Sequence, residues 1–308
     1  MSEPVGRSVA VVADSYLHRL DARMATTGTV LCLGLDPDPA SLPPGFARDV
    51  GGLELFARLL LEAALPFAAA VKPNLAFYEA FGAEGLAALE RLRALIPSDV
   101  PVIVDAKRAD IGSTAARQAV ALFDRLGADA ITVNPYLGGA AIAPLLERQD
   151  RFAYVLCRTS NPGAGELQGL RVEADAEIDA PAEPLWARVA RRAGGWGPGG
   201  TVGLVVGATA PDELAAIRAI APALPFLVPG VGEQGGDVAQ VLRHGPVGAG
   251  SGGAASETPS GAPFGPRLLV NVSRGITAAA AAAPAGTDPG ESLAGAARGW
   301  ANRLPVLT

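Results

Sequence analysis

Short apolar runs recur along the chain and alternate with segments in which apolar residues have a helical spacing. Nearly continuous apolar runs are typical of parallel strands that are covered on both faces. Eight such runs can be counted, at 30–36, 67–74, 100–107, 130–134, 152–160, 201–209, 225–232 and 267–274. Amphipathic helices are predicted between or after them, at 53–65, 84–96, 114–127, 211–221 and near 290–303.

This alternation predicts an α/β fold. Strands that alternate with helices form right-handed βαβ units, and eight such units close into a (β/α)8 TIM barrel. An open doubly wound sheet is the second alternative. We expect a single domain over 1–308 with an N-terminal helix. Two loop insertions interrupt the pattern, the acidic segment 161–183 and the low-complexity segment 248–266, and the latter is predicted to be largely disordered.

Composition narrows the class of protein. Of 308 residues, 49% are hydrophobic and 18% charged, which is enough apolar material for one large core. A net charge of −6 argues against a general nucleic-acid binder. Cys32 and Cys157 lie in apolar runs and are expected to be buried thiols in a reducing compartment, while His18 and His244 are expected to be structural. No signal peptide or membrane-spanning stretch is apparent, so a soluble cytoplasmic protein is predicted.

Ionisable residues gather at the predicted end of the third strand. Asp105 and Lys107 are two positions apart, so a regular strand would point both side chains to one face, and Asp110 follows. Alone, these residues could be a solvated strand end with Asp110 near a helix start. Lys72 ends the neighbouring second strand, which would bring its ammonium group beside Asp105. A buried array of alternating charges is a poor route to stability, so function explains it better.

A phosphate site is predicted at the ends of the seventh and eighth strands. The segment "VPGVGEQGGD" (228–237), which includes Pro229 and Gln234, contains four glycines that would let backbone N–H groups approach an anion. Arg274 follows the eighth strand, where its guanidinium could bind phosphate oxygens. Barrels often bind phosphate with these two loops.

Further polar residues end other strands. Asp36 follows the first strand and could start a proline turn or accept hydrogen bonds from sugar hydroxyls. Ser160 follows the fifth strand and could start the loop or bind a base edge. Asn134 and Tyr136 end the fourth strand and are expected only to line the pocket.

These motifs together resemble the orotidine 5'-phosphate decarboxylase family, in its branch with "KPNxAFYE" and "DAKRxDIGST". The similarity runs from Asp36 to Arg274 and includes "TSNPGA" and "PGVGEQGGD". Ala109 stands where the branch commonly has Gly, and the Gly/Ser-rich insertion before the last strand is atypical. The resemblance implies decarboxylation of orotidine 5'-phosphate to uridine 5'-phosphate (UMP) without cofactor or metal, in pyrimidine synthesis.

The resemblance also implies residue roles. Lys107 would protonate C6, with Asp105 against the departing carboxylate and Lys72 holding Asp105 and the ribose. Asp36 would bind the ribose, Ser160 the pyrimidine, and Gln234 and Arg274 the phosphate, with Pro229 in the same loop. In this family Asp110 and Thr114 reach into the neighbouring subunit's site, which implies a homodimer.

Three alternatives remain open at this point. A related sugar-phosphate decarboxylase or aldolase on the same barrel would need a divalent metal. A Schiff-base aldolase would use Lys72 or Lys107 as an amine, although paired carboxylates keep a lysine protonated and non-nucleophilic. A non-catalytic nucleotide sensor would bind UMP without turnover.

Overall fold

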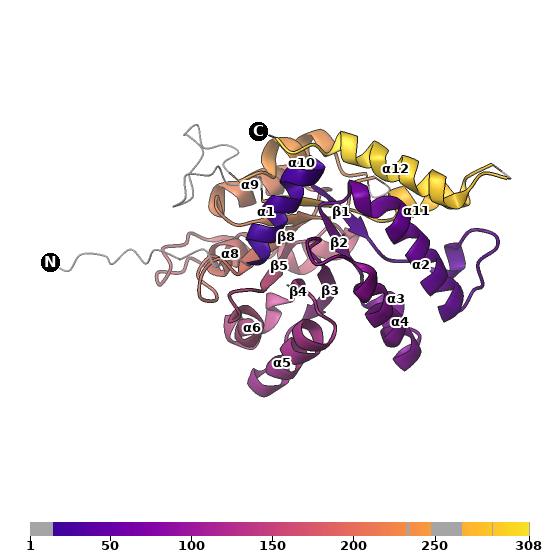
Figure 1. The fold of residues 1–308 in the computed structure, drawn as a ribbon. Helices are drawn as coiled ribbons and strands as arrows, with labels where there is room; N and C mark the ends of the chain where they lie inside the picture. Colours follow the sequence, from indigo (N-terminus) through magenta and orange to yellow (C-terminus); the bar gives the residue numbers. More distant parts are fainter. Residues whose placement is uncertain (1–14, 233–234, 248–266, 285, 308) are drawn as a thin grey trace.

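Eight parallel strands form the centre of the computed structural model, which describes residues 15–232, 235–247, 267–284 and 286–307 (Figure 1). Their order around the sheet is β2-β1-β10-β9-β8-β5-β4-β3. The strands are β1 (Leu31–Gly34), β2 (Ala70–Lys72), β3 (Ile103–Arg108), β4 (Ala130–Val133), β5 (Phe152–Arg158), β8 (Val202–Val206), β9 (Phe226–Val228) and β10 (Leu268–Val272). The first and last strands of this order are joined by two parallel bridges, Val71–Val102 and Asn74–Asp105. The barrel is therefore nearly closed, and the (β/α)8 prediction is confirmed.

Helices surround the strands and link them in sequence (Figure 1). They are α1 (Tyr16–Thr27), α2 (Val50–Ala64), α3 (Ala76–Glu79), α4 (Gly82–Leu95), α5 (Gly112–Ala119), α6 (Gly139–Leu146), α7 (Gly165–Gln168), α8 (Leu185–Ala193), α9 (Pro211–Ile220), α10 (Val238–His244), α11 (Arg274–Ala281) and α12 (Pro289–Arg303). The predicted helix 114–127 is divided, because α5 continues as a π-helical turn over Val120–Arg125. In the described part of the chain, no helix is long and apolar enough to cross a membrane.

The acidic segment 161–183 is folded. It contains α7 and, with Pro184, two short antiparallel strands, β6 (Arg171–Val172) and β7 (Glu183–Pro184). Arg188 of α8 forms ion pairs with Asp175 (3.3 Å) and Glu183 (3.0 Å), so helix α8, which was not predicted, holds the segment against the barrel. The low-complexity segment 248–266 lies outside the described residues.

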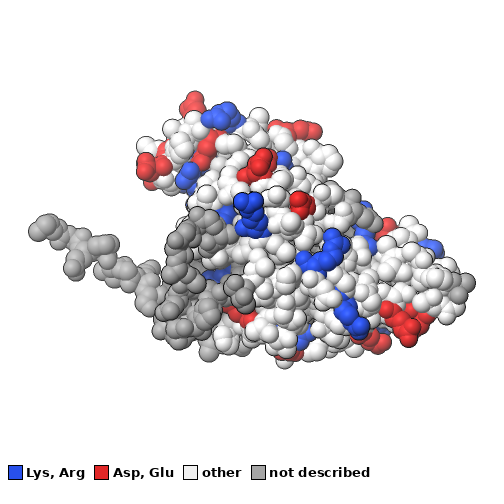
Figure 2. Space-filling model, turned by 90° about the horizontal axis from the view of Figure 1, so that it is seen from above, with Lys and Arg blue, Asp and Glu red and all other residues white. Residues whose placement is uncertain are grey.

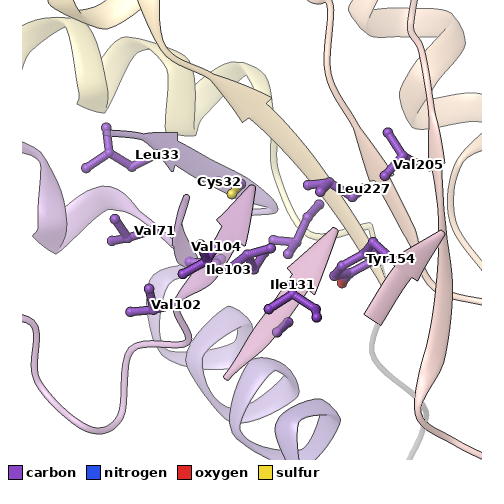
Figure 3. Close-up of a cluster of buried hydrophobic side chains, with 14 of the residues drawn as sticks. Cys32, Leu33, Val71, Val102, Ile103, Val104, Ile131, Tyr154, Val205 and Leu227 are labelled. Atoms are coloured by element: carbon purple, nitrogen blue, oxygen red, sulfur yellow. The ribbon is translucent and has the colours of Figure 1, made fainter. Parts of the chain in front are cut away.

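The barrel interior is filled by apolar side chains from most of the strands, including Cys32, Val104, Ile131 and Leu227 (Figure 3). Both cysteines are free and buried, as predicted, and burial raises the pKa of the Cys32 thiol to about 12. Helix α1 packs against β5 through Tyr16, whose ring stacks on Phe152 at 4.9 Å and whose hydroxyl is 3.0 Å from that of Tyr154. The face seen in Figure 2 carries basic and acidic side chains interspersed among uncharged ones.

Gly34 allows β1 and the turn after β10 to approach closely. A Cβ atom at this position would lie 2.4 Å from Ser273 Cβ and 2.9 Å from Ser273 Cα, which real side chains do not tolerate. Ser273 directly precedes Arg274, the first residue of α11. The missing side chain therefore lets the turn that carries Arg274 sit against the first strand.

We predict that Gly34→Ala lowers the free energy of unfolding by about 1–3 kcal/mol, because the backbone of the β10–α11 turn must move. Gly295 in α12 is the matched control, since a Cβ there meets nothing within 4 Å. Gly295→Ala should raise the stability by about 0.4–1 kcal/mol by restricting the unfolded chain. Urea unfolding of both variants measures the two effects, and equal stability of the two variants would contradict the proposed close approach.

Candidate active site

Three charged side chains meet at the carboxyl ends of β2 and β3. Lys72 Nζ lies 3.1 Å from Asp105 Oδ2, and Lys107 Nζ lies 2.7 Å from Asp105 Oδ1. The exposed fractions of the side chains differ, at 5% for Lys72, 13% for Asp105 and 49% for Lys107. One nearly buried carboxylate thus bridges a buried ammonium group and a half-exposed one, as the sequence predicts.

The route by which Lys107 reaches Asp105 differs from the prediction. The register between β3 and β4 shifts between Val104 and Arg108, and Lys107 has a φ of 49°, so simple strand alternation does not apply. Thr132 of β4 supplies hydrogen bonds at the position where the ladder between β3 and β4 is irregular. Its hydroxyl donates to Asp105 Oδ1 (2.8 Å) and accepts the Lys107 backbone N–H (2.9 Å). Sequence analysis missed Thr132, because nothing in its local sequence marks it.

The electrostatics of this cluster favour the charged forms. Burial alone would raise the pKa of Asp105, but the ammonium groups of Lys72 and Lys107 and hydrogen bonds from Lys107 and Thr132 bring it well below its usual range. Burial alone would lower the pKa of Lys72, yet the carboxylates of Asp105 and Asp36 raise it above its ordinary value. Lys72 is therefore a fixed cation near neutral pH, not an amine nucleophile.

Lysine usage singles out the same two positions. Of the 25 basic residues in the chain, 23 are Arg, and the only two Lys are Lys72 and Lys107. An Arg side chain carries the same positive charge as a Lys side chain. It cannot release a proton at neutral pH, however, and its charged group is planar and bulkier. The site therefore requires a compact ammonium group where the rest of the chain uses guanidinium.

A pocket of about 520 Å³ opens beside the cluster. Lys72, Asp105 and Asp36 line one part of it, and Pro229, Gly230 and Arg274 line another. Asp36 is oriented by the backbone N–H of Asn74, which donates to Asp36 Oδ1 at 2.8 Å. Predicted residues from β1, β2, β3 and the turns after β9 and β10 thus share one cavity. Lys107 is not among the described residues that line it and contacts the cavity's Asp105 from the side of β3.

Asn271 and Ser273 also line the pocket and were not predicted. Within the described residues, Asn271 Oδ1 and Ser273 Oγ are buried polar atoms without a hydrogen-bond partner. Such groups are costly unless a ligand or water satisfies them, so both are suited to a polar ligand. The β10 alternation in "LLVNVS" could have indicated Asn271, which is the polar exception in an apolar strand.

The remaining predicted residues lie elsewhere around the rim. Asp110 follows β3 and accepts a hydrogen bond from the Ile111 N–H (2.7 Å), and Thr114 is exposed in the first turn of α5. Ser160 follows β5, and its backbone lies so close to Gly207 that a Cβ there would meet Ser160 N at 2.7 Å. None of these three is among the described residues that line the pocket. Gln234 lies outside the described residues.

The expectation that Asn134 and Tyr136 line the pocket is wrong. Asn134 caps a 3₁₀ turn, where its Oδ1 accepts the Tyr136 N–H at 3.0 Å, and the Tyr136 side chain is 76% exposed on the outer rim. Neither residue is among the described residues that line the pocket. Among the described residues, no group of three or more His, Cys, Asp or Glu side chains is arranged to hold a metal ion.

Comparison with known proteins gives consistent names. Residues 29–287 match the family described as "Orotidine 5'-phosphate decarboxylase / HUMPS family". A Thermomicrobium roseum protein named orotidine 5'-phosphate decarboxylase is 46% identical over 270 residues, which are 87% of this chain and 89% of that protein. One of the same name from Halorubrum lacusprofundi is 50% identical over 232 residues, or 75% of this chain and 80% of its own. The solved structure of Leishmania donovani OMP decarboxylase superposes with a TM-score of 0.71 at 38% identity, covering 93% of this chain and 95% of that one.

We predict that Asp105→Asn lowers the free energy of unfolding at pH 7 by about 3 kcal/mol, because the buried Lys72 ammonium loses its closest counter-charge. The depressed pKa of Asp105 means that the carboxylate stabilises the fold above the pKa of an unfolded Asp, about 3.9. The difference between wild type and variant should therefore be constant from pH 7 to about pH 5 and shrink below pH 4.

Urea unfolding across this pH range measures the difference, with Asp212→Asn in the exposed first turn of α9 as the matched control. A wild-type advantage that persists undiminished at pH 2 would contradict the assignment of the charge pairing to Asp105.

Proposed function

The chain belongs to the orotidine 5'-phosphate decarboxylase / HUMPS family, and from this premise we propose that it converts orotidine 5'-phosphate to UMP and carbon dioxide in pyrimidine biosynthesis. The observation that carries the proposal is that one pocket is lined both by Lys72 and Asp105 and by Arg274. The substrate has a carboxylate on its base and a phosphate at its far end. A single cavity with a charged cluster and a separate cation suits both ends.

The nucleotide would lie across the pocket. Arg274 and the turn that begins at Pro229 would hold the phosphate, together with Gln234 as the family resemblance implies. Asp36 and Lys72 would bind the ribose hydroxyls, since Asp36 is already oriented by Asn74. Ser160 would contact the pyrimidine edge from the end of β5, as the family resemblance implies.

Lys107 would supply the proton. The bond between C6 and the carboxyl carbon breaks, carbon dioxide leaves, and the electron pair stays on C6. That carbanion is poorly delocalised, so an ammonium group beside C6 stabilises the charge as it develops. Lys107 Nζ then transfers a proton to C6, and its 49% exposure lets water reprotonate it after product release. A guanidinium could match the charge but not the proton transfer.

Asp105 has two functions in this proposal. It holds both ammonium groups in place through contacts of 3.1 and 2.7 Å. It also lies beside the substrate carboxylate, and the repulsion between the two anions is relieved as the carboxylate becomes neutral carbon dioxide. The binding energy of the distant phosphate offsets the unfavourable approach, so truncated substrates should lose turnover as well as affinity.

A homodimer would complete the site. Asp110 and Thr114 do not line the pocket of their own chain, which agrees with the family resemblance, in which both serve the neighbouring subunit. Ile111, which lies between Asp110 and Thr114 in the chain, is a large apolar side chain with an exposed fraction of 73%. A second copy that covers these residues would bring Asp110 to its partner's cluster.

The proposal requires no cofactor and is consistent with a cytoplasmic location, where the buried free thiols Cys32 and Cys157 stay reduced. The alternatives make different predictions. A metal-dependent reaction on a sugar phosphate would stop in the presence of a chelator, and a nucleotide sensor would bind UMP without turnover. Loss of the absorbance of orotidine 5'-phosphate, followed with and without chelator, separates the proposal from both alternatives, and undiminished turnover with chelator supports the proposal.

We predict that Lys107→Ala and Lys107→Arg both reduce the turnover number by about 10²- to 10⁴-fold or more, because both remove the proton donor. Lys107→Arg keeps a positive charge and is the matched control for electrostatics. UMP binding, measured by calorimetry, should weaken less than about 10-fold in Lys107→Arg, since the phosphate contacts remain. Near-normal turnover of either variant would remove Lys107 from the role of acid.

We predict that subunits with different lesions complement each other. Lys107→Ala and Asp110→Asn homodimers should each be nearly inactive. In a mixed dimer one site carries both lesions and the other carries neither. After random exchange of equal amounts, half of the dimers are mixed, so activity should return to about one quarter of wild type. No recovery in a mixture that demonstrably exchanges subunits would show that Asp110 acts within its own chain or not at all.

A further inference from the structure

We propose that Thr132 of β4 is a positioning residue for the decarboxylation, a role that rests on the proposed function. Its hydroxyl holds the Asp105 carboxylate and the Lys107 backbone together, and so aims the Lys107 ammonium group at the reacting carbon. Thr132 does not touch the substrate in this proposal, because it acts through its two neighbours on β3.

The Thr132 hydroxyl donates one hydrogen bond and accepts one. Oγ1 donates to Asp105 Oδ1 at 2.8 Å and accepts from the Lys107 N–H at 2.9 Å. The side chain is 98% buried, with 2% exposed, so water cannot replace either bond. The same Oδ1 atom accepts Lys107 Nζ at 2.7 Å. Thr132 thus binds the backbone amide of Lys107 directly. It is linked to the Lys107 ammonium group through the Asp105 carboxylate, which both groups contact.

The backbone of Lys107 explains why such an anchor is needed. Its φ of 49° is one of only three positive values at non-glycine residues in the described part of the chain. A side chain disfavours this conformation, so the surrounding structure must hold it. The ladder between β3 and β4 is interrupted between Val104 and Arg108, and the Thr132 hydroxyl binds the Lys107 N–H within that gap.

Thr29 provides a matched control at the opposite end of the barrel. It is also buried, its Oγ1 donates to Leu304 O (2.7 Å), and it accepts the Leu31 N–H (3.1 Å). Thr29→Val and Thr132→Val therefore each remove a buried hydroxyl that accepts one backbone N–H. The Thr29 hydroxyl donates to backbone carbonyls, of Leu304 and of Ala301 (3.3 Å), and the Thr132 hydroxyl donates to a carboxylate. A merely structural role for Thr132 predicts equal consequences for catalysis, while a positioning role predicts a difference.

The test compares wild type, Thr132→Val, Thr132→Ser and Thr29→Val with orotidine 5'-phosphate. We expect kcat of Thr132→Val to fall about 10- to 100-fold with KM changed less than about 3-fold, because a displaced lysine costs rate rather than binding. Thr132→Ser keeps the hydroxyl and should stay within about 3-fold of wild type in kcat. Thr29→Val should lose stability but keep its kcat.

A spectroscopic measurement tests the same claim without turnover. Because Lys72 and Lys107 are the only lysines of the chain, lysine labelled with ¹³C at Cε gives two side-chain NMR signals. We expect Thr132→Val to shift the Lys107 signal, assigned by its loss in Lys107→Arg, whereas Thr29→Val leaves it in place. This measurement serves even if Thr132→Val is too unstable for kinetics, because its spectrum can be recorded at a lower temperature at which the variant is folded.

The outcomes separate the two proposals. If wild type does not decarboxylate the substrate, the proposed function fails and the catalytic role of Thr132 fails with it. If wild type is active and Thr132→Val retains its kcat, only the inference about Thr132 is overturned. It is equally overturned if Thr132→Ser is as slow as Thr132→Val, or if the Lys107 signal does not move.

Discussion

The carboxylate of Asp105, held between two ammonium groups, is the interaction on which the site depends. The buried Lys72 could not be kept charged at the end of a barrel strand without it, because burial disfavours a cation that has no counter-charge. The same carboxylate holds the Lys107 ammonium group at 2.7 Å. The arrangement is a poor means of stabilising a fold, since desolvation offsets much of the attraction between the charges. Its value is that it delivers a defined positive charge next to a pocket.

The barrel makes this arrangement possible. Lys72 and Asp105 are 33 positions apart in the chain but lie at the ends of strands bridged by Asn74–Asp105 and Val71–Val102. Parallel strands end at the same rim, so every strand can contribute one side chain to a common cavity. The close approach at Gly34 lets the β10–α11 turn lie against β1, and Arg274, the first residue after this turn, lines the same pocket.

Lysine and arginine occupy different kinds of site in this chain. The chain has 23 arginines, several of which form ion pairs, such as those of α8 with the segment 161–183, and its only two lysines are in the cluster. Arginine forms forked contacts with carboxylates and stays protonated, which suits structural pairs. Lysine offers a compact ammonium that can give up a proton, which suits the proposed protonation of C6.

The sequence by itself determined the eight strands, the barrel and the residues Lys72, Asp105, Asp36 and Arg274 as a set. This was possible because apolar runs mark buried parallel strands, and a charged residue directly after such a run must lie at the rim.

Only the tertiary structure decided how Lys107 reaches Asp105. Strand alternation predicted the contact, but the actual strand is irregular there, and the geometry depends on Thr132, 25 positions away from Lys107. A threonine in an apolar strand carries no local sign of its partner, since hydrogen bonds between strands follow register, which forms only when the sheet assembles. The sequence also could not show that neither Asn134 nor Tyr136 lines the pocket, because this depends on the 3₁₀ turn by which the chain leaves β4.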